Sequence, residues 1–175
     1  MTVFHAVIAF VLVQRSAELV LAHLNTARLV RVGATEIDRA GYKWIVALHA
    51  AWLAALITTV PSETQPNWPL LALFFGLQLG RVWVIASLGR RWTTRVIALP
   101  GAPLMTAGPY RYLRHPNYAI VAAELAILPL AFAAVAIAAV FSACNAVLLI
   151  RRIRLENAAL GLSSYHIRET LPRRS

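Results

Sequence analysis

The sequence Gly108-Pro109-Tyr110-Arg111-Tyr112-Leu113-Arg114-His115-Pro116-Asn117-Tyr118 separates two long apolar parts of the chain and is its densest cluster of polar chemistry. Pro116 disfavours an α conformation at His115 and suits the first position of a helix, so a helix is predicted to begin there. Free backbone N–H groups at a helix start favour a negative group on a ligand. The stretch is therefore interpreted as the rim of a binding site, with a solvated basic loop as the alternative.

Long apolar runs surround this stretch and set the fold class. Hydrophobic residues make up 59% of the 175-residue chain and charged residues only 14%, with a mean hydropathy of +0.65. The runs cover residues 3–24, 44–60, 68–88 and 119–150. The first three approach the ~20 residues that cross a bilayer. The fourth is long for one span and contains Pro129 near its middle. We therefore predict an all-α integral membrane protein of one domain, residues 1–175. It would have five spans, and the last two would form a hairpin of short helices broken near Pro129.

The charge distribution predicts the topology. The chain carries a net charge of +10, and its basic residues lie mainly between the apolar runs, in segments 28–43 and 90–114 and after residue 151. The connection 61–66 carries only Glu63. Positive charge on the cytoplasmic side then places the N-terminus outside and both basic loops and the C-terminus inside. Membrane lipids, rather than nucleic acid, are the predicted partner of these charges. Segment 90–114 could also attract an anionic group of a ligand.

The amino-acid composition bears on the cellular compartment and on metal binding. Sixteen arginines against one lysine, with abundant alanine, hint at a GC-rich bacterial source and hence at a bacterial inner membrane. Cys144 is the single cysteine and lies in an apolar run, so no disulfide framework or cysteine metal site is predicted. Gln14, Arg15 and Glu18 interrupt the first apolar run, which indicates a retained span rather than a cleaved signal peptide.

Ionisable residues inside the apolar runs face a bundle interior or a cavity, because they are expensive at membrane depth. Arg15 and Glu18 share a helical face and fit either a packing ion pair or a site. Glu124 could pair with Arg81 or Arg114, or hold a ligand, and the ion pair is favoured. A histidine in the second run, His49, is more typical of a satisfied core residue than of a ligand.

Two further segments could contribute to a site. The proline and glycine content of residues 99–109 excludes a regular helix, and irregular backbone at membrane level is tolerated where protein buries it or it lines a cavity. This segment is therefore a reasonable pocket wall. Arg152 and Glu156 are one helical turn apart on one face, and spacing alone favours a surface salt bridge between them.

Two motifs together resemble the isoprenylcysteine carboxyl methyltransferase family of integral membrane enzymes. They are Gly108-x-Tyr110-x-x-x-Arg114-His115-Pro116-x-Tyr118 and, after a helical hairpin, Arg152-x-x-x-Glu156. The resemblance covers residues 76–170, and the first two spans are similar to the small bacterial branch. It implies a cofactor-binding methyltransferase core with a cytoplasmic tail over residues 67–175, preceded by two spans and a loop over residues 1–66.

The resemblance also implies S-adenosylmethionine as the methyl donor, bound on the cytoplasmic side. Arg152 and Glu156 would be the catalytic residues, with Arg152 facing the methyl acceptor. Aromatic faces and the Glu156 carboxylate would suit a sulfonium cation. The implied cofactor contacts are Ala102, Pro103, Leu104, Met105, Tyr110, His115, Pro116, Asn117, Tyr118 and Glu156.

The predicted activity is methyl transfer to an oxygen, a carboxylate or an enol or phenol hydroxyl, of a lipophilic acceptor within the membrane. Many relatives have a second acid where this chain has Asn157, and the acceptor could be an isoprenoid or a polyketide. Two alternatives remain open. One is an NADPH-dependent membrane reductase of the sterol reductase type. The other is a non-catalytic lipid-binding or transport protein that uses Arg15, Glu18 and His49 as a proton relay.

Overall fold

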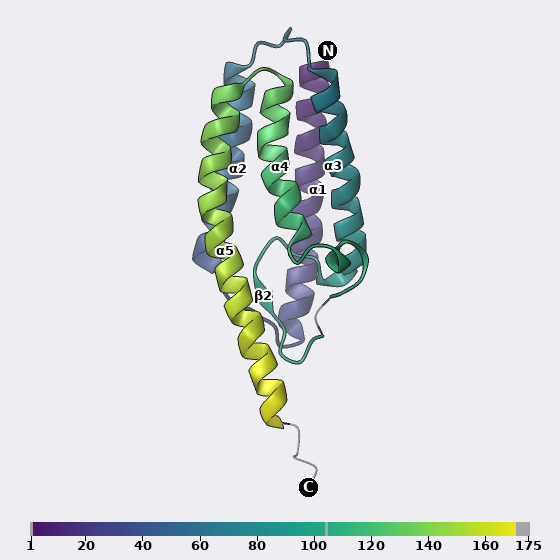
Figure 1. Cartoon of the computed structure of the whole chain (residues 1–175), viewed down its shortest axis with the longest axis vertical. Helices are drawn as coiled ribbons and strands as arrows, with labels where there is room; N and C mark the ends of the chain where they lie inside the picture. Colours follow the sequence, from purple (N-terminus) through teal and green to yellow (C-terminus); the bar gives the residue numbers. More distant parts are fainter. Residues whose placement is uncertain (1, 104, 171–175) are drawn as a thin grey trace.

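The computed structural model describes residues 2–103 and 105–170, with side chains up to residue 159. Its described part is built from five α-helices that run along the long axis of the molecule (Figure 1). Helix α4 packs between α3 and α5, and α5 also packs against α2. The predicted all-α fold is confirmed. The helices are α1 (Val3–Arg31), α2 (Arg39–Thr59), α3 (Trp68–Leu88), α4 (Pro116–Ala131) and α5 (Val135–Thr170).

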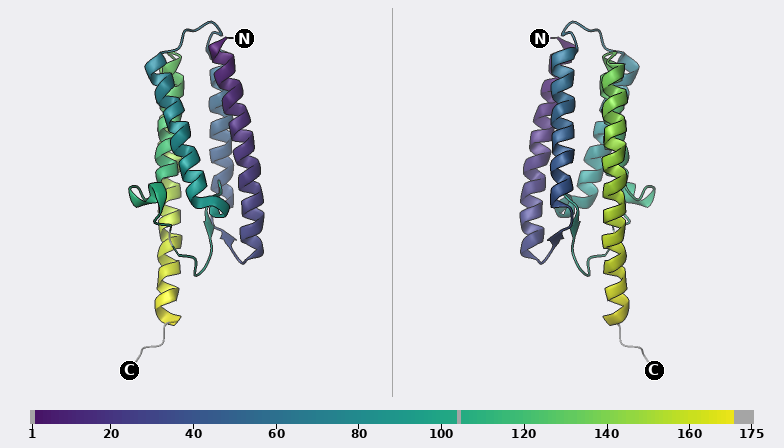
Figure 2. Two further views of the ribbon diagram at one scale, coloured as in Figure 1. Left: turned by 90° about the vertical axis from the view of Figure 1, so that its right-hand side faces the viewer. Right: turned by 90° about the vertical axis from the view of Figure 1, so that its left-hand side faces the viewer.

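The chain connections alternate between the two ends of the bundle. The N-terminus lies at one end with the α2–α3 and α4–α5 connections (Figures 1 and 2). The α1–α2 and α3–α4 connections lie at the opposite end, where the C-terminal part of α5 extends beyond the other helices. The three basic segments therefore share one end, which we call the basic end. The membrane side that this end faces stays a prediction.

Four of the described helices are long and apolar enough to cross a membrane, namely α1, α2, α3 and α5. Helix α4 has 16 residues and is a shorter apolar helix beside them. Toward the N-terminal end of the bundle, side chains from all five helices form one apolar core. Its best buried members include Val11, Trp52, Leu56, Phe74, Leu125 and Leu128. The chain is thus a helical membrane protein.

Local sequence signals explain the helix starts. Asp38 caps α2 by accepting a hydrogen bond from the Gly41 N–H (3.0 Å), and Asn67 caps α3 by accepting one from the Leu70 N–H (3.2 Å). Each cap satisfies one of the donors that a helix start leaves free. Pro116 occupies the first position of α4, as predicted. The α4 start at the basic end is therefore set by the sequence of the 108–118 stretch itself.

The predicted helical hairpin broken near Pro129 is confirmed, although its second helix is longer than expected. Pro129 lies inside the last turn of α4, and the chain reverses at Phe132–Ala134 with Ala133 at φ 58°. Helix α5 then runs for 36 residues, far beyond the apolar run. Its polar extension is rich in arginine, leucine, glutamate and alanine, which are strong helix formers, so the helix continues after the apolar run ends.

The predicted polar loop after the first span is shorter than expected, because α1 continues to Arg31 and α2 starts at Arg39. Arg28 and Arg31 lie in the last turn of α1, where positive charge favours the helix dipole. Between the helices, strand β1 (Thr35–Glu36) pairs antiparallel with strand β2 (Ile97–Ala98) of the α3–α4 connection. No pattern in the sequence indicated this ribbon.

Candidate functional site

A cavity of about 660 Å³ lies at the basic end of the bundle. The cavity is walled by the α1–α2 connection, the long α3–α4 connection, the start of α4 and about two turns of α5. A smaller cavity of about 420 Å³ is lined by Thr59, Val60, Pro61, Thr64 and residues 132–137. These residues include no ionisable side chain, so the larger cavity is the candidate site.

Most of the predicted site residues meet at this cavity. Pro116 is buried at the start of α4 without being among the lining residues, and Leu104 lies outside the described residues. The fold brings the other predicted residues together, whereas contacts between these residues and a cofactor stay a prediction. The predicted residues that line the cavity are Ala102, Pro103, Met105, Tyr110, His115, Asn117, Tyr118, Arg152 and Glu156.

Arg152, Tyr118 and Glu156 form a hydrogen-bonded chain on the cavity wall. Arg152 Nε donates to the Tyr118 hydroxyl oxygen (2.9 Å), and that hydroxyl donates to Glu156 Oε2 (2.5 Å). Arg152 is only 7% exposed, and its guanidinium carbon lies 5.5 Å from the centre of the Tyr118 ring. The surface salt bridge favoured by spacing was therefore wrong, because the phenol of Tyr118 lies between the two charged groups.

His115 extends this chain at the α4 start. Its ring stacks on Tyr118, with centroids 5.4 Å apart and an interplanar angle of 18°. His115 Nδ1 lies 3.8 Å from Glu156 Oε2, and Nε2 lies 3.3 Å from Asn157 Oδ1. Asn157 stands where many relatives have a second acid, and it contacts the site through the His115 ring.

Two polar atoms of cavity-lining residues are buried and have no hydrogen-bond partner among the described residues. They are Asn117 Oδ1, an acceptor in the first turn of α4, and Trp92 Nε1, a donor in the α3–α4 connection. Unsatisfied buried polar groups are rare in folded proteins and require an explanation. The two groups are the unsatisfied buried polar atoms among the described residues that line the candidate site.

The Tyr110 phenol is predicted to stay protonated well into the alkaline range. Burial, with a further contribution from the Glu156 carboxylate, raises the pKa of Tyr110 to about 12. Because the folded-state pKa is the higher one, the stabilising effect is complete below the ordinary pKa and is lost as pH rises through the folded value. Spectrophotometric titration of tyrosinate should show an ionisation near pH 12 in the wild type that is absent from a Tyr110→Phe variant. A component that ionises near the ordinary pKa would contradict this.

The structure also brings Thr94 to the site, which the sequence analysis missed. Its backbone carbonyl accepts a hydrogen bond from Arg152 Nη2 (2.6 Å). Arg95, Val96 and Ile97, which follow it, line the cavity together with Ile37 of the α1–α2 connection. No side-chain pattern signals a carbonyl partner, and the basic run from Arg90 to Arg95 had been assigned to topology or to an anionic group.

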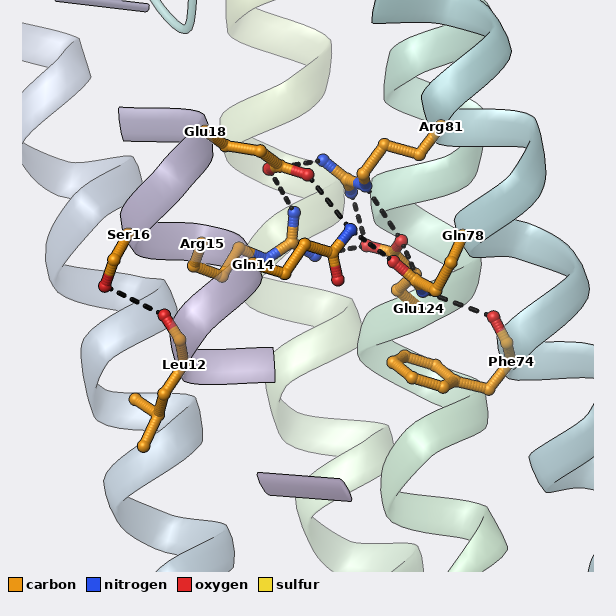
Figure 3. Close-up of polar contacts among 9 residues, drawn as sticks. All are labelled: Leu12, Gln14, Arg15, Ser16, Glu18, Phe74, Gln78, Arg81 and Glu124. Atoms are coloured by element: carbon orange, nitrogen blue, oxygen red, sulfur yellow. Dashed lines mark hydrogen bonds and ion pairs between the residues drawn. The ribbon is translucent and has the colours of Figure 1, made fainter. Parts of the chain in front are cut away.

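A second polar cluster lies deeper in the bundle and joins α1, α3 and α4 (Figure 3). Glu124, which is fully buried, accepts hydrogen bonds from Arg15 (2.5 Å), Gln78 (2.9 Å) and Arg81 Nε (3.0 Å), and pairs again with Arg81 Nη2. Glu18 accepts from Arg15 (2.8 Å) and Arg81 (3.1 Å). The two arginines and two glutamates balance in charge, so the cluster forms a compensated helix-packing network.

This network resolves the alternatives left open for the charged residues. Glu124 pairs with Arg81, as one expectation had it, and with Arg15, whereas Arg114 lines the cavity at the basic end. His49 donates from Nδ1 to the Ile45 carbonyl one turn earlier in its own helix (2.8 Å). Both observations support packing roles for these residues over a proton relay.

Comparison with known proteins adds two findings. A model of the isoprenylcysteine carboxyl methyltransferase (ICMT) family matches residues 70–161. The chain is also 37% identical over 161 residues to the uncharacterized protein YpbQ of Bacillus subtilis (strain 168), an alignment that covers 90% of this chain and 96% of that protein. No solved structure matches the chain. The matched segment runs from α3 to α5 and includes both motifs that line the cavity.

Proposed function

Since the chain belongs to the isoprenylcysteine carboxyl methyltransferase family, a family of membrane methyltransferases, we propose that it methylates an oxygen of a lipophilic acceptor with S-adenosylmethionine as donor. The observation that carries this proposal is the Arg152–Tyr118–Glu156 chain on the wall of the 660 Å³ cavity. It joins a cation suited to an anionic acceptor with an anion suited to a cationic donor.

The cavity residues fit the proposed donor. The volume lies within the roughly 300–1,000 Å³ typical of small-molecule sites. The Glu156 carboxylate and the faces of Tyr110 and Tyr118 favour a positive group, and the buried Asn117 Oδ1 lacks a hydrogen-bond partner among the described residues. Arg91 and Arg114, which also line the cavity, suit a carboxylate. When bound, S-adenosylmethionine supplies an activated methyl group on a sulfonium sulfur.

The acceptor would be held by Arg152. Its guanidinium is fixed on one side by the Tyr118 hydroxyl and on the other by the Thr94 carbonyl. A cation fixed in this way favours the deprotonated form of an acceptor oxygen. Apolar residues from the α1–α2 and α3–α4 connections, including Ile37, Val96 and Leu99, would exclude water and contact an apolar tail. Alignment and charge complementarity can then supply most of the rate enhancement.

The proposed location is the bacterial inner membrane with the cavity on the cytoplasmic side. The cavity lies at the basic end of the bundle, and an excess of arginine in short loops favours the cytoplasmic side. This orientation would let a soluble donor enter from the cytoplasm and a lipid acceptor from the bilayer.

Methyl transfer can be tested without knowing the acceptor. Purified protein in lipid nanodiscs, incubated with methyl-labelled S-adenosylmethionine and a bacterial lipid extract, should move label into the organic phase. Alkaline hydrolysis then separates the acceptor classes, because a methyl ester releases volatile methanol and a methyl ether does not. Label that stays in the aqueous phase with folded wild-type protein would contradict the proposal.

A Tyr118→Phe variant tests the hydrogen-bonded chain. Removing the hydroxyl takes one hydrogen-bond partner from each of Arg152 and Glu156, so transfer is expected to fall about tenfold, the effect of losing one charge-assisted hydrogen bond. Tyr112→Phe is the matched control, since Tyr112 also borders the cavity but is 73% exposed and takes no part in the Arg152–Tyr118–Glu156 chain. Initial rates measured at saturating donor give the comparison, and equal rates for both variants would refute the role of the hydroxyl.

A further inference from the structure

The family model begins within α3, yet the α1–α2 connection contributes directly to the cavity. We infer that Glu36 and Asp38, two acids of this connection, are positioning residues that hold Arg152 in the orientation an acceptor requires. The inference rests on the proposed role of Arg152 in holding the acceptor. It extends the functional site to an N-terminal segment outside the family match.

Glu36 fixes the segment that carries the Thr94 carbonyl. Both Glu36 oxygens accept hydrogen bonds from Arg95 Nη1 (2.8 Å each), and Glu36 also pairs with Ile97 across the β1–β2 ribbon. The Ile37 N–H donates to the Val96 carbonyl (3.0 Å). Because Arg95 directly follows Thr94, this ion pair restricts the carbonyl that accepts the hydrogen bond from Arg152.

Tyr42, in the first turns of α2, supports the same segment. The Thr94 hydroxyl donates to the Tyr42 oxygen (3.1 Å), and the Arg95 guanidinium lies 4.6 Å from the centre of the Tyr42 ring. Thr94 and Arg95 are thus held from the side of the α1–α2 connection by an ion pair, a cation–π contact and a hydrogen bond.

Asp38 pairs with Arg151, the residue next to Arg152 on α5. Arg151 donates to both Asp38 oxygens, from Nη2 (2.9 Å) and from Nη1 (3.2 Å). The Asp38 carboxylate is itself oriented by the Gly41 N–H, which it caps. The paired arrangement of two N–H groups on a carboxylate adds geometric specificity to charge attraction. Glu36 and Asp38 therefore pair with the residue that follows Thr94 and with the residue that precedes Arg152.

The Arg152 guanidinium makes two hydrogen bonds with different consequences. Tyr118 connects it to Glu156 and to the proposed donor side, whereas Thr94 connects it to the α1–α2 connection. Loosening the Thr94 contact should leave the Tyr118–Glu156 hydrogen bond intact. Variants at Glu36 and Asp38 should therefore change acceptor use much more than donor binding.

The first test needs no acceptor. Arginine modification by phenylglyoxal, followed by peptide mass spectrometry of the full-length protein in nanodiscs, reports how well each guanidinium is held. In Glu36→Ala and Asp38→Ala, Arg152 is expected to react about tenfold faster than in the wild type, which corresponds to the loss of one charge-assisted interaction. Arg154, which is exposed on the same helix, is the internal reference. Unchanged reactivity of Arg152 in both variants would overturn the inference.

A charge-preserving variant and a rescue separate positioning from loss of charge. A Cβ at Gly41 would overlap both Asp38 Oδ2 and Arg151 Nη1, so Gly41→Ala should displace this ion pair and raise Arg152 reactivity without removing a charge. Glu36→Arg and Arg95→Glu should each raise Arg152 reactivity, and the double variant should restore its protection. Glu63→Ala, in the α2–α3 connection, is the control for a lost acid. Failure of the double variant to restore protection would overturn the role assigned to Glu36.

The kinetic test distinguishes this inference from the proposed function. In the positioning variants, transfer into a lipid extract is expected to fall about tenfold while the Kd of labelled S-adenosylmethionine changes less than about twofold. If the positioning variants lost donor binding and thermal stability together, the inference would be overturned, and Glu36 and Asp38 would have a general role in folding. If wild-type protein bound no S-adenosylmethionine, the proposed function would fail, and Arg152 reactivity would still decide whether Glu36 and Asp38 position that side chain.

Discussion

Replacing Glu156 with alanine is expected to weaken S-adenosylmethionine binding about 30- to 100-fold, the range for removing one partner of a hydrogen-bonded charge pair that keeps some solvent access. The carboxylate accepts the Tyr118 hydroxyl at 2.5 Å and lies 3.8 Å from His115 Nδ1. Its loss would remove the anion from the cavity wall and leave Tyr118 without its acceptor. Equilibrium binding of labelled donor to the protein in nanodiscs measures the effect.

Two further variants give the controls for this result. Glu156→Gln keeps an oxygen for the Tyr118 hydroxyl but removes the charge, so an intermediate loss of affinity is expected. Arg154→Ala changes an exposed residue two positions away on α5 and should bind donor normally. Donor affinity in Glu156→Ala equal to that of Arg154→Ala would contradict the assignment of Glu156 to the donor side.

Replacing Glu124 with leucine is expected to lower the free energy of unfolding by roughly 3–5 kcal/mol, the cost of leaving buried charge uncompensated. Glu124 is fully buried and accepts hydrogen bonds from Arg15, Gln78 and Arg81 (Figure 3). Its removal would leave two arginines facing Glu18 alone. Chemical unfolding in mixed detergent micelles, monitored by circular dichroism, provides the measurement.

A double replacement sharpens this prediction. In Arg81→Met with Glu124→Leu, Arg15 and Glu18 remain as a neutral pair at 2.8 Å. The double variant should therefore be more stable than Glu124→Leu alone, because replacing a whole buried ion pair with apolar groups is often neutral, whereas removing one partner is not. Additive destabilisation by the two changes would contradict the compensated-network interpretation.

The elements that were predicted correctly depend on local sequence. Pro116 sets the start of α4 because its fixed φ and missing N–H act on its own residue and on His115. The apolar runs identified the helices because a membrane span requires length and hydrophobicity that few other elements have. The motif residues of the 108–118 stretch and of α5 also met at one cavity, as their resemblance to a family implied.

The elements that were missed depend on tertiary contacts. The β1–β2 ribbon has two residues per strand and forms only once the helices bring residues 35–36 beside residues 97–98. The choice of Arg15 and Arg81 over Arg114 as partners of Glu124 depends on helix rotation and depth, which charge content does not specify. The partners of Arg152 are a phenol from α4 and a backbone carbonyl, so the i, i+4 spacing to Glu156 pointed to the wrong contact.

Saturable binding of S-adenosylmethionine to the purified, folded protein tests the central claim most directly. Isothermal titration in nanodiscs should show one site for S-adenosylmethionine, competition by S-adenosylhomocysteine, and no binding of NADPH at the same concentrations. The Glu156→Ala variant should bind the donor about 30- to 100-fold more weakly. Saturable NADPH binding without S-adenosylmethionine binding would instead contradict the account and support the reductase alternative.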